Sequence, residues 1–78
     1  MNAKFEEILN QVNPEILDSE GMDLVEEGII DSMMIMQMVS MLESAFEFDF
    51  DPEDIAPENF ETVNAIWEVV EKYVAEKD

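Results

Sequence analysis

The stretch GIIDSMMIMQM, residues 28–38, decides where the central helix of this chain begins. Asp31 is a good N-cap, because its carboxylate can accept hydrogen bonds from the free amides of the following turn. Good helix formers continue from there to about Phe46, so we predict a helix whose first residue is Ser32. A single serine therefore stands at the head of the most apolar segment of the sequence.

The period of the apolar residues predicts two further helices. Residues 3–12 place their apolar side chains on one helical face, and Asn13-Pro14 ends this helix, because the residue before a proline is pushed out of the helical region. Thr62 is the predicted N-cap of a last helix with the same period. The core-facing residues predicted for these two helices are Phe5, Ile8, Leu9, Val12, Val63, Ile66, Trp67, Val70, Tyr73 and Val74.

The segments between these helices are irregular. Residues 14–31 contain a proline and two glycines, which break regular structure, and we expect their apolar residues to anchor this long connection to the core. Residues 47–51, EFDFD, alternate acidic and aromatic side chains as a strand does, but an isolated strand has no partner, so we predict an extended linker. Pro52 and Pro57 each open a short turn, and Phe60 is predicted to plug the core. The predicted anchors of the long connection are Ile16, Leu17, Met22, Leu24, Val25, Ile29 and Ile30.

These segments together predict an all-α fold. It is a small four-helix bundle with a long loop between helices I and II and a short helix III. A chain of 78 residues is enough for one compact core, so we assign residues 1–78 to a single domain.

Charge restricts the partners of this chain. It has 21 acidic and 3 basic residues, a formal net charge of −18. Nucleic acid is excluded as a partner, because its binding depends on neutralising phosphates with Lys and Arg, and direct membrane insertion is not expected. The first residues lack the apolar run of a signal peptide, and no segment reaches the length of a membrane span. We therefore expect a cytoplasmic monomer whose partners offer basic faces.

Composition also argues against catalysis. The chain has no Cys and no His, so Ser32 has no histidine to activate it as a nucleophile, and the three lysines are far away along the sequence. The acids around Asp49 do not form a calcium loop, because Asp54 stands where glycine is needed and Phe60 where a bidentate glutamate is needed. We predict neither catalytic residues nor a metal site.

The residues around Ser32 match a known motif. Asp31 supplies the cap, which leaves the Ser32 hydroxyl at the positive end of the helix dipole, where a phosphate group is favoured. Residues 27–33, EGIIDSM, resemble the attachment motif of acyl carrier proteins: an acidic or polar residue, Gly, two aliphatics, Asp, Ser and then Leu or Met. The likeness extends over Asp23-Leu24, Leu42 to Phe46, Asp51 to Ile55, Phe60, Thr62-Val63 and Ile66.

This resemblance implies a carrier and not an enzyme. In the family, the motif serine receives a phosphopantetheine arm, whose terminal thiol carries the cargo as a thioester. Carried over to this chain, Ser32 is the attachment point, and Asp31 caps the helix and helps to position the metal of the modifying enzyme. The implied partners are a phosphopantetheinyl transferase, a ligase that loads acyl or aminoacyl groups, and downstream transferases or synthases with basic docking faces.

The helix after Ser32 departs from the fatty-acid carriers of this family. Those carriers usually have acids soon after the serine and again about one turn later, where this chain has Met34 and Gln37, and only Glu43 remains of the later acids. We expect Met38 and Met41 to fill the core. The predicted partner-docking face consists of Met33, Met34, Met36, Gln37, Ser40 and Glu43.

The loss of these acids from the helix after Ser32 bears on which kind of carrier this chain is. A free-standing carrier of acyl or aminoacyl groups is preferred, of the kind that carries D-alanine, amino acids of secondary metabolism or unusual acyl chains, with a D-alanyl or peptidyl subtype among the options. A carrier of fatty acid synthesis is the first alternative. An alternative of another class is an acidic, Met-rich helical interaction module without a prosthetic group. Such a module does not need a serine directly after the Gly-Ile-Ile-Asp turn.

Overall fold

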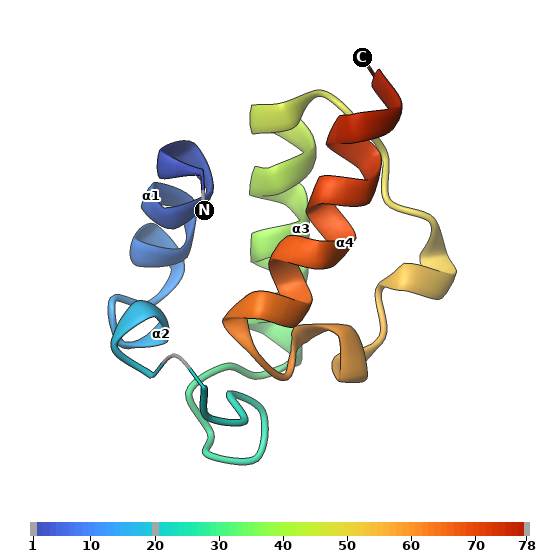
Figure 1. Cartoon of the computed structure of the whole chain (residues 1–78). Helices are drawn as coiled ribbons and strands as arrows, with labels where there is room; N and C mark the ends of the chain where they lie inside the picture. Colours follow the sequence, from blue (N-terminus) through green and yellow to red (C-terminus); the bar gives the residue numbers. More distant parts are fainter. Residues whose placement is uncertain (1, 20, 78) are drawn as a thin grey trace.

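The computed structural model describes residues 2–19 and 21–77, and the regular structure in these ranges is entirely helical (Figure 1). Its α-helices are α1 (Ala3–Val12), α2 (Glu15–Asp18), α3 (Ser32–Phe46) and α4 (Val63–Lys77). Two 3-10 turns, η1 (Pro52–Asp54) and η2 (Pro57–Phe60), lie between α3 and α4. The predicted all-α bundle is confirmed.

Asparagine side chains define both ends of α1. The Oδ1 atom of Asn2 accepts hydrogen bonds from the amides of Lys4, at 2.8 Å, and Phe5, at 3.2 Å. At the other end, Asn13 leaves the helical conformation before Pro14, as predicted. Its Nδ2 atom donates to the Ile29 carbonyl at 2.9 Å. Asn13 therefore ends α1 and also holds the segment that leads into α3.

The three long helices enclose one hydrophobic core. α1 packs against α3, and the Lys4 Nζ atom donates to the Ala45 carbonyl at 3.1 Å, so the start of α1 lies at the end of α3. The rings of Phe5 in α1 and Trp67 in α4 are in contact, with centroids 4.9 Å apart. Fully buried side chains come from each long helix, from the long connection and from the turn before α4: Phe5, Leu9, Ile16, Leu24, Ile30, Met38, Leu42, Phe60, Val63, Ile66 and Val70.

Two of the predicted connections differ in detail. The long connection contains the one-turn helix α2, which the sequence did not predict, and Met22 is 46% exposed, so its prediction as a core anchor is wrong. The predicted short helix III consists of the two 3-10 turns η1 and η2 and not of an α-helix. In both places the helical segment has at most four residues, too few to show an apolar period.

Residues 48–51 have no regular structure, as the linker prediction requires, but Glu47 is not extended, because it ends α3 in the left-handed conformation with a φ of 56°. Aromatic contacts explain the path of the linker. Phe48 and Phe50 lie over Tyr73 of α4, with ring centroids 4.8 Å and 5.4 Å away. The Phe50 amide donates to the Glu43 carboxylate at 2.8 Å, which joins the linker to α3. Side-chain contacts, together with backbone hydrogen bonds from Glu47 and Phe48 to the Glu43 carbonyl, therefore hold residues 47–51 in place without a second strand.

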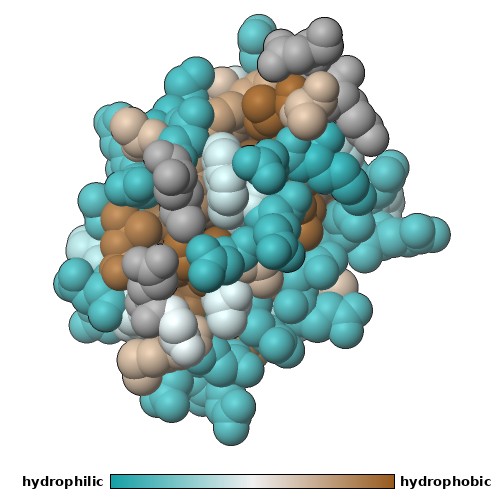
Figure 2. Space-filling view, in the orientation of Figure 1, coloured by the Kyte–Doolittle hydropathy of each residue, from teal (hydrophilic) through white to brown (hydrophobic). Residues whose placement is uncertain are grey.

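The surface is mostly hydrophilic. Figure 2 shows polar side chains over much of the visible face, with small hydrophobic areas between them. In the part of the chain that the structure describes, none of the helices combines the length and the apolar character that a membrane crossing needs.

Candidate functional site

The start of α3 has the geometry of a capped helix. The backbone of Asp31 is extended, and its Oδ1 atom accepts a hydrogen bond from the Met34 amide at 2.9 Å. The Asp31 carbonyl accepts from the Ile35 amide, also at 2.9 Å. The predicted N-cap is confirmed, and so is the position of Ser32 as first residue of the helix.

The preceding turn presents Ser32 to solvent. The amides of Ile29 and Ile30 both donate to the Leu24 carbonyl, at 2.9 Å and 3.1 Å. The turn requires a φ of +75° at position 28, which glycine adopts readily because it has no Cβ atom. Ile30 is thereby placed in the core, with 1% of its surface exposed. The chain then leaves the core, so Asp31 and Ser32 lie on the surface.

The Ser32 side chain is available for modification. It is exposed, and within the described residues its hydroxyl makes no hydrogen bond, because Asp31 supplies the cap. Helix geometry leaves the amides of Ser32 and Met33 without an acceptor inside α3. A phosphate attached to the Ser32 oxygen would therefore lie in open space, next to the positive end of the 15-residue helix α3, which stabilises its negative charge.

An apolar depression lies beside this serine. It is open to solvent, has a volume of about 120 Å³, and is lined by Ser32, Ile35, Met36, Ile55 and Pro57. One wall belongs to the first turns of α3, and the other to Ile55, which follows η1, and Pro57, the first residue of η2. Sequence reasoning did not place Ile55 and Pro57 at the site. The only signal was an isoleucine between two turn-forming prolines.

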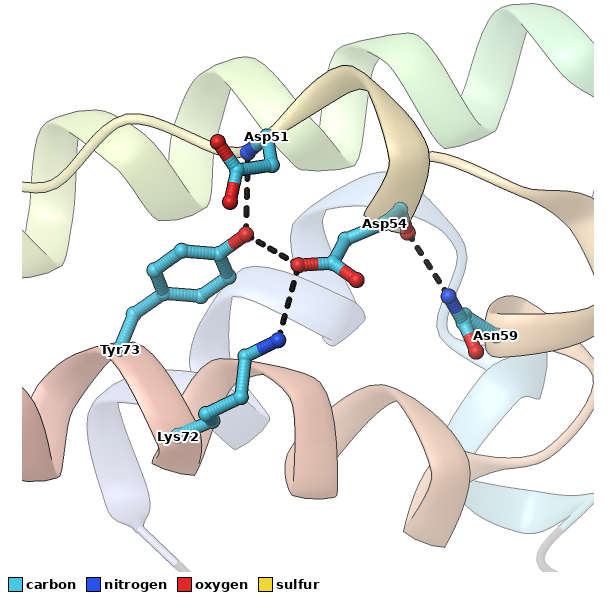
Figure 3. Close-up of polar contacts among 5 residues, drawn as sticks. All are labelled: Asp51, Asp54, Asn59, Lys72 and Tyr73. Carbon is cyan, nitrogen blue, oxygen red and sulfur yellow. Dashed lines mark hydrogen bonds and ion pairs between the residues drawn. The ribbon is translucent and has the colours of Figure 1, made fainter.

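A polar network holds the far wall of the depression (Figure 3). The Tyr73 hydroxyl accepts a hydrogen bond from the Asp51 amide at 2.9 Å and donates to the Asp54 carboxylate. The Lys72 Nζ atom pairs with the same carboxylate at 3.0 Å, and the Asn59 side chain donates to the Asp54 carbonyl at 3.1 Å. Asp54 directly precedes Ile55, so the network fixes the residue that lines the depression.

The network shifts two pKa values in opposite directions. The hydrogen bond from Tyr73, followed by that from Lys72, lowers the pKa of Asp54 below its ordinary value of 3.8. Burial, followed by the hydrogen bond to Asp54, raises the pKa of Tyr73 above its ordinary value of 10.0. At neutral pH, Asp54 is therefore ionised and Tyr73 is the donor between them.

The predicted docking residues occupy different environments. Met33 and Met36 are 81% and 54% exposed, and Gln37 and Ser40 are exposed as well. Met34, predicted to be an exposed member of this face, is instead half-buried and packs against the core, because its position in α3 turns it toward the other helices. Glu43 is also half-buried and accepts from the Phe50 amide. Met38 is fully buried and Met41 half-buried, as expected for core methionines.

Residues 3–70 match the family model described as the phosphopantetheine attachment site. The chain belongs to this phosphopantetheine-carrier family. The resemblance noted in the sequence is confirmed: these residues form a carrier domain and not a catalytic domain, with phosphopantetheine as its cofactor.

Curated relatives of this carrier are also found. The D-alanyl carrier proteins of Lactococcus lactis subsp. cremoris, strain MG1363, and subsp. lactis, strain IL1403, are each 38% identical to it over 52 residues. The match covers 67% of the carrier and 66% of each relative, so the carrier spans about two thirds of the length of the curated relatives it matches. No solved structure gives a significant match.

The residues of the carrier fit the cofactor. Three other serines lie in the sequence, but Ser19 follows the one-turn helix α2, and Ser40 and Ser44 lie inside α3, where no helix amides are free. The Thr62 hydroxyl is already used, because it accepts from the Ala65 amide at 3.0 Å. Ser32 alone among these combines exposure, a free hydroxyl and the start of a long helix.

Proposed function

We propose that this chain is a free-standing carrier, with residues 1–78 as one carrier domain, that is modified with phosphopantetheine at Ser32. The observation that supports the site is the exposed Ser32 hydroxyl at the start of α3, with its capping role taken by Asp31. When bound, the cofactor supplies a thiol on a long arm, which holds cargo as a thioester. The chain itself supplies the attachment oxygen, the helix amides beside it and the surface that partner enzymes contact.

The proposed cargo is an aminoacyl group, with D-alanine as the first candidate. Two observations support this choice. The curated relatives bear the name D-alanyl carrier protein. In addition, α3 has Met34 and Gln37 where fatty-acid carriers usually have acids, so its face near Ser32 differs from theirs.

The proposed partners are a phosphopantetheinyl transferase and an ATP-dependent ligase that loads the amino acid. Both should approach the exposed face of α3 formed by Met33, Met36, Gln37 and Ser40. A net charge of −18 favours enzymes with basic docking faces and increases their rate of encounter at low salt. The methionines then supply apolar, adaptable contact surface beside the attachment oxygen.

The attachment site is tested by intact mass. The purified chain is incubated with a phosphopantetheinyl transferase and coenzyme A, and we expect the mass to increase by one phosphopantetheine unit. Ser32→Ala should stay unmodified, whereas Ser44→Ala, which removes an exposed serine in the last turn of α3 and outside the docking face, should be modified like the wild type. A wild-type chain that stays bare, or a Ser32→Ala variant that is modified, refutes the site.

The cargo is tested on the modified protein. It is incubated with ATP, a D-alanine-activating ligase and D-alanine, and in parallel with an acyl-activating ligase and fatty acids. A D-alanyl thioester in the mass spectrum supports the proposal. Loading by fatty acids alone would assign the chain to the alternative, a carrier of fatty acid synthesis.

The docking face is tested by a charge placed on it. Met36→Glu should slow aminoacyl transfer to a cognate partner by roughly ten-fold, because a carboxylate there must lose water in an apolar contact. Met22→Glu is the matched control, since Met22 is 46% exposed but lies in the loop before Ser32. The helical circular dichroism of both variants should be that of the wild type. Equal rates in the two variants would count against this docking face.

A further inference from the structure

Methionines supply all the sulfur atoms of this chain, and the fold exposes some of them and buries others. The sequence contains seven Met and no Cys, so thioethers are its only oxidisable sulfur atoms. Met33 is 81% exposed, Met36 54% and Met22 46%, while Met38 is fully buried. An oxidant in solution therefore reaches a few thioethers directly and is kept from others by the core.

Of the methionines that the structure describes, the two most exposed lie beside the attachment serine. Met33 directly follows Ser32, and Met36 is one helical turn further on and lines the same depression as Ser32. Positions 33 and 36 are neighbours on the helix surface, as are positions 32 and 36. A change at either thioether therefore alters the surface that any enzyme must contact to reach the serine oxygen.

We propose that Met33 and Met36 form a redox-sensitive modification site, at which a peroxide converts both thioethers to sulfoxides and thereby slows the encounter of Ser32 with partner enzymes. The location of the oxidation follows from exposure alone, whereas its effect on partners depends on the function proposed above. The site is distinct from the attachment oxygen, which is not oxidised.

The oxidation of each thioether to a sulfoxide balances with hydrogen peroxide as the oxidant. A sulfur lone pair attacks one peroxide oxygen, the S–O bond forms and the O–O bond breaks. After proton transfer, the other oxygen leaves as water. The sulfur loses two electrons, which the peroxide gains, and a methionine sulfoxide reductase reverses the change.

The sulfoxide changes the contact surface without unfolding the protein. A flexible apolar side chain becomes polar, so burying it against a partner leaves an S=O group that needs a hydrogen bond. Because Met33 and Met36 contribute little to the core, the helices should remain intact. We expect the modification of Ser32 by a transferase to slow by roughly ten-fold, the size of effect for burying one unpaired polar group.

Peptide mapping after limited hydrogen peroxide treatment tests the location. Mass spectrometry should find sulfoxide first at Met33, then at Met36 and the loop control Met22, and last at Met38. Oxidation of Met33 and Met36 no faster than of Met38 overturns the proposal. This measurement needs no partner enzyme, so it is independent of the proposed function.

The rate of phosphopantetheine transfer tests the effect. Peroxide-treated wild type should be modified slowly, and the treated double variant Met33→Leu with Met36→Leu should keep its untreated rate, because leucine conserves volume and cannot form a sulfoxide. Met22→Leu should remain as sensitive as the wild type. Equal loss of rate in the double variant overturns the proposal. If untreated wild type receives no phosphopantetheine, the proposed attachment site is refuted. The peptide map of sulfoxides still tests the oxidation site in that case.

Discussion

The Tyr73 hydroxyl joins the α3–α4 connection to the last helix through two hydrogen bonds, one from the Asp51 amide and one to Asp54. We expect Tyr73→Phe to lower the free energy of unfolding by about 1–2 kcal/mol at pH 7, since it removes both bonds and one of them has a charged acceptor. The ring stacking on Phe48 should survive in this variant. Urea denaturation followed by circular dichroism measures the difference, and an unchanged midpoint would show that the network does not stabilise the fold.

The pH dependence of this difference follows from the direction of the two shifts. The pKa of Asp54 is lowered on folding, so its contribution is present above its ordinary value of 3.8 and is lost as the pH falls through the lower folded value. The pKa of Tyr73 is raised, so its contribution is present below its ordinary value of 10.0 and is lost as the pH rises through the higher folded value. The effect of Tyr73→Phe should therefore be constant near neutral pH and shrink at both extremes. In an Asp54→Asn background, the acidic decrease should disappear.

Single residues of the site differed in how far the sequence predicted them. Asp31 and Ser32 were predictable because a cap and the first helical residue depend on their immediate neighbours. The pair of Asp54 and Tyr73 was not, because the two lie 19 positions apart in the sequence and only the fold brings η1 and α4 together. Met34 was misjudged for a related reason: its burial depends on the neighbours of α3 and not on its own sequence.

At the scale of the element, the start of α3 depends on one side-chain acceptor. Asp31→Ala should lower the free energy of unfolding by about 1 kcal/mol, the usual cost of a lost N-cap. Asp31→Asn keeps an oxygen that can accept from the Met34 amide and removes the charge, so its loss should be only a few tenths of a kcal/mol. Thermal unfolding of both variants measures this. Equal losses would show that the charge of Asp31, acting on the helix dipole, matters more than its hydrogen bond.

The starts of the three long helices could be predicted from the sequence to the residue, whereas the short elements could not. α1 and α3 have enough turns to repeat their apolar period, and their ends coincide with Asn13-Pro14 and Asp31. α2 has four residues, and its start depends on the Asn13 side chain, which accepts from the Glu15 amide at 3.0 Å. The two 3-10 turns were recognisable by their prolines, but their helix type and their place beside Ser32 depend on contacts with α4.

At the scale of the whole molecule, a chain with a net charge of −18 folds into a body whose described part measures 34 × 25 × 19 Å. The screening length is about 30 Å at 0.01 M salt and about 8 Å at 0.15 M, so at low salt each carboxylate repels nearly all the others. The repulsion is smaller in the expanded unfolded chain. The lysines do little to reduce this repulsion, because Lys4 is bound to the Ala45 carbonyl and Lys72 to the Asp54 carboxylate.

Salt should therefore stabilise the fold and slow its encounters at the same time. Between 0.01 M and 0.15 M NaCl, we expect the free energy of unfolding to rise on the order of 1 kcal/mol, which is roughly 4–8 °C in Tm for a chain of this size. Over the same range, the association rate with a basic transferase should fall, since screening weakens long-range attraction. Both effects should level off once the screening length is shorter than the spacing between carboxylates, whereas a general salt effect on apolar burial would continue to grow. A Tm that stays constant from 0.01 M to 0.15 M would show that the acids do not destabilise the folded state.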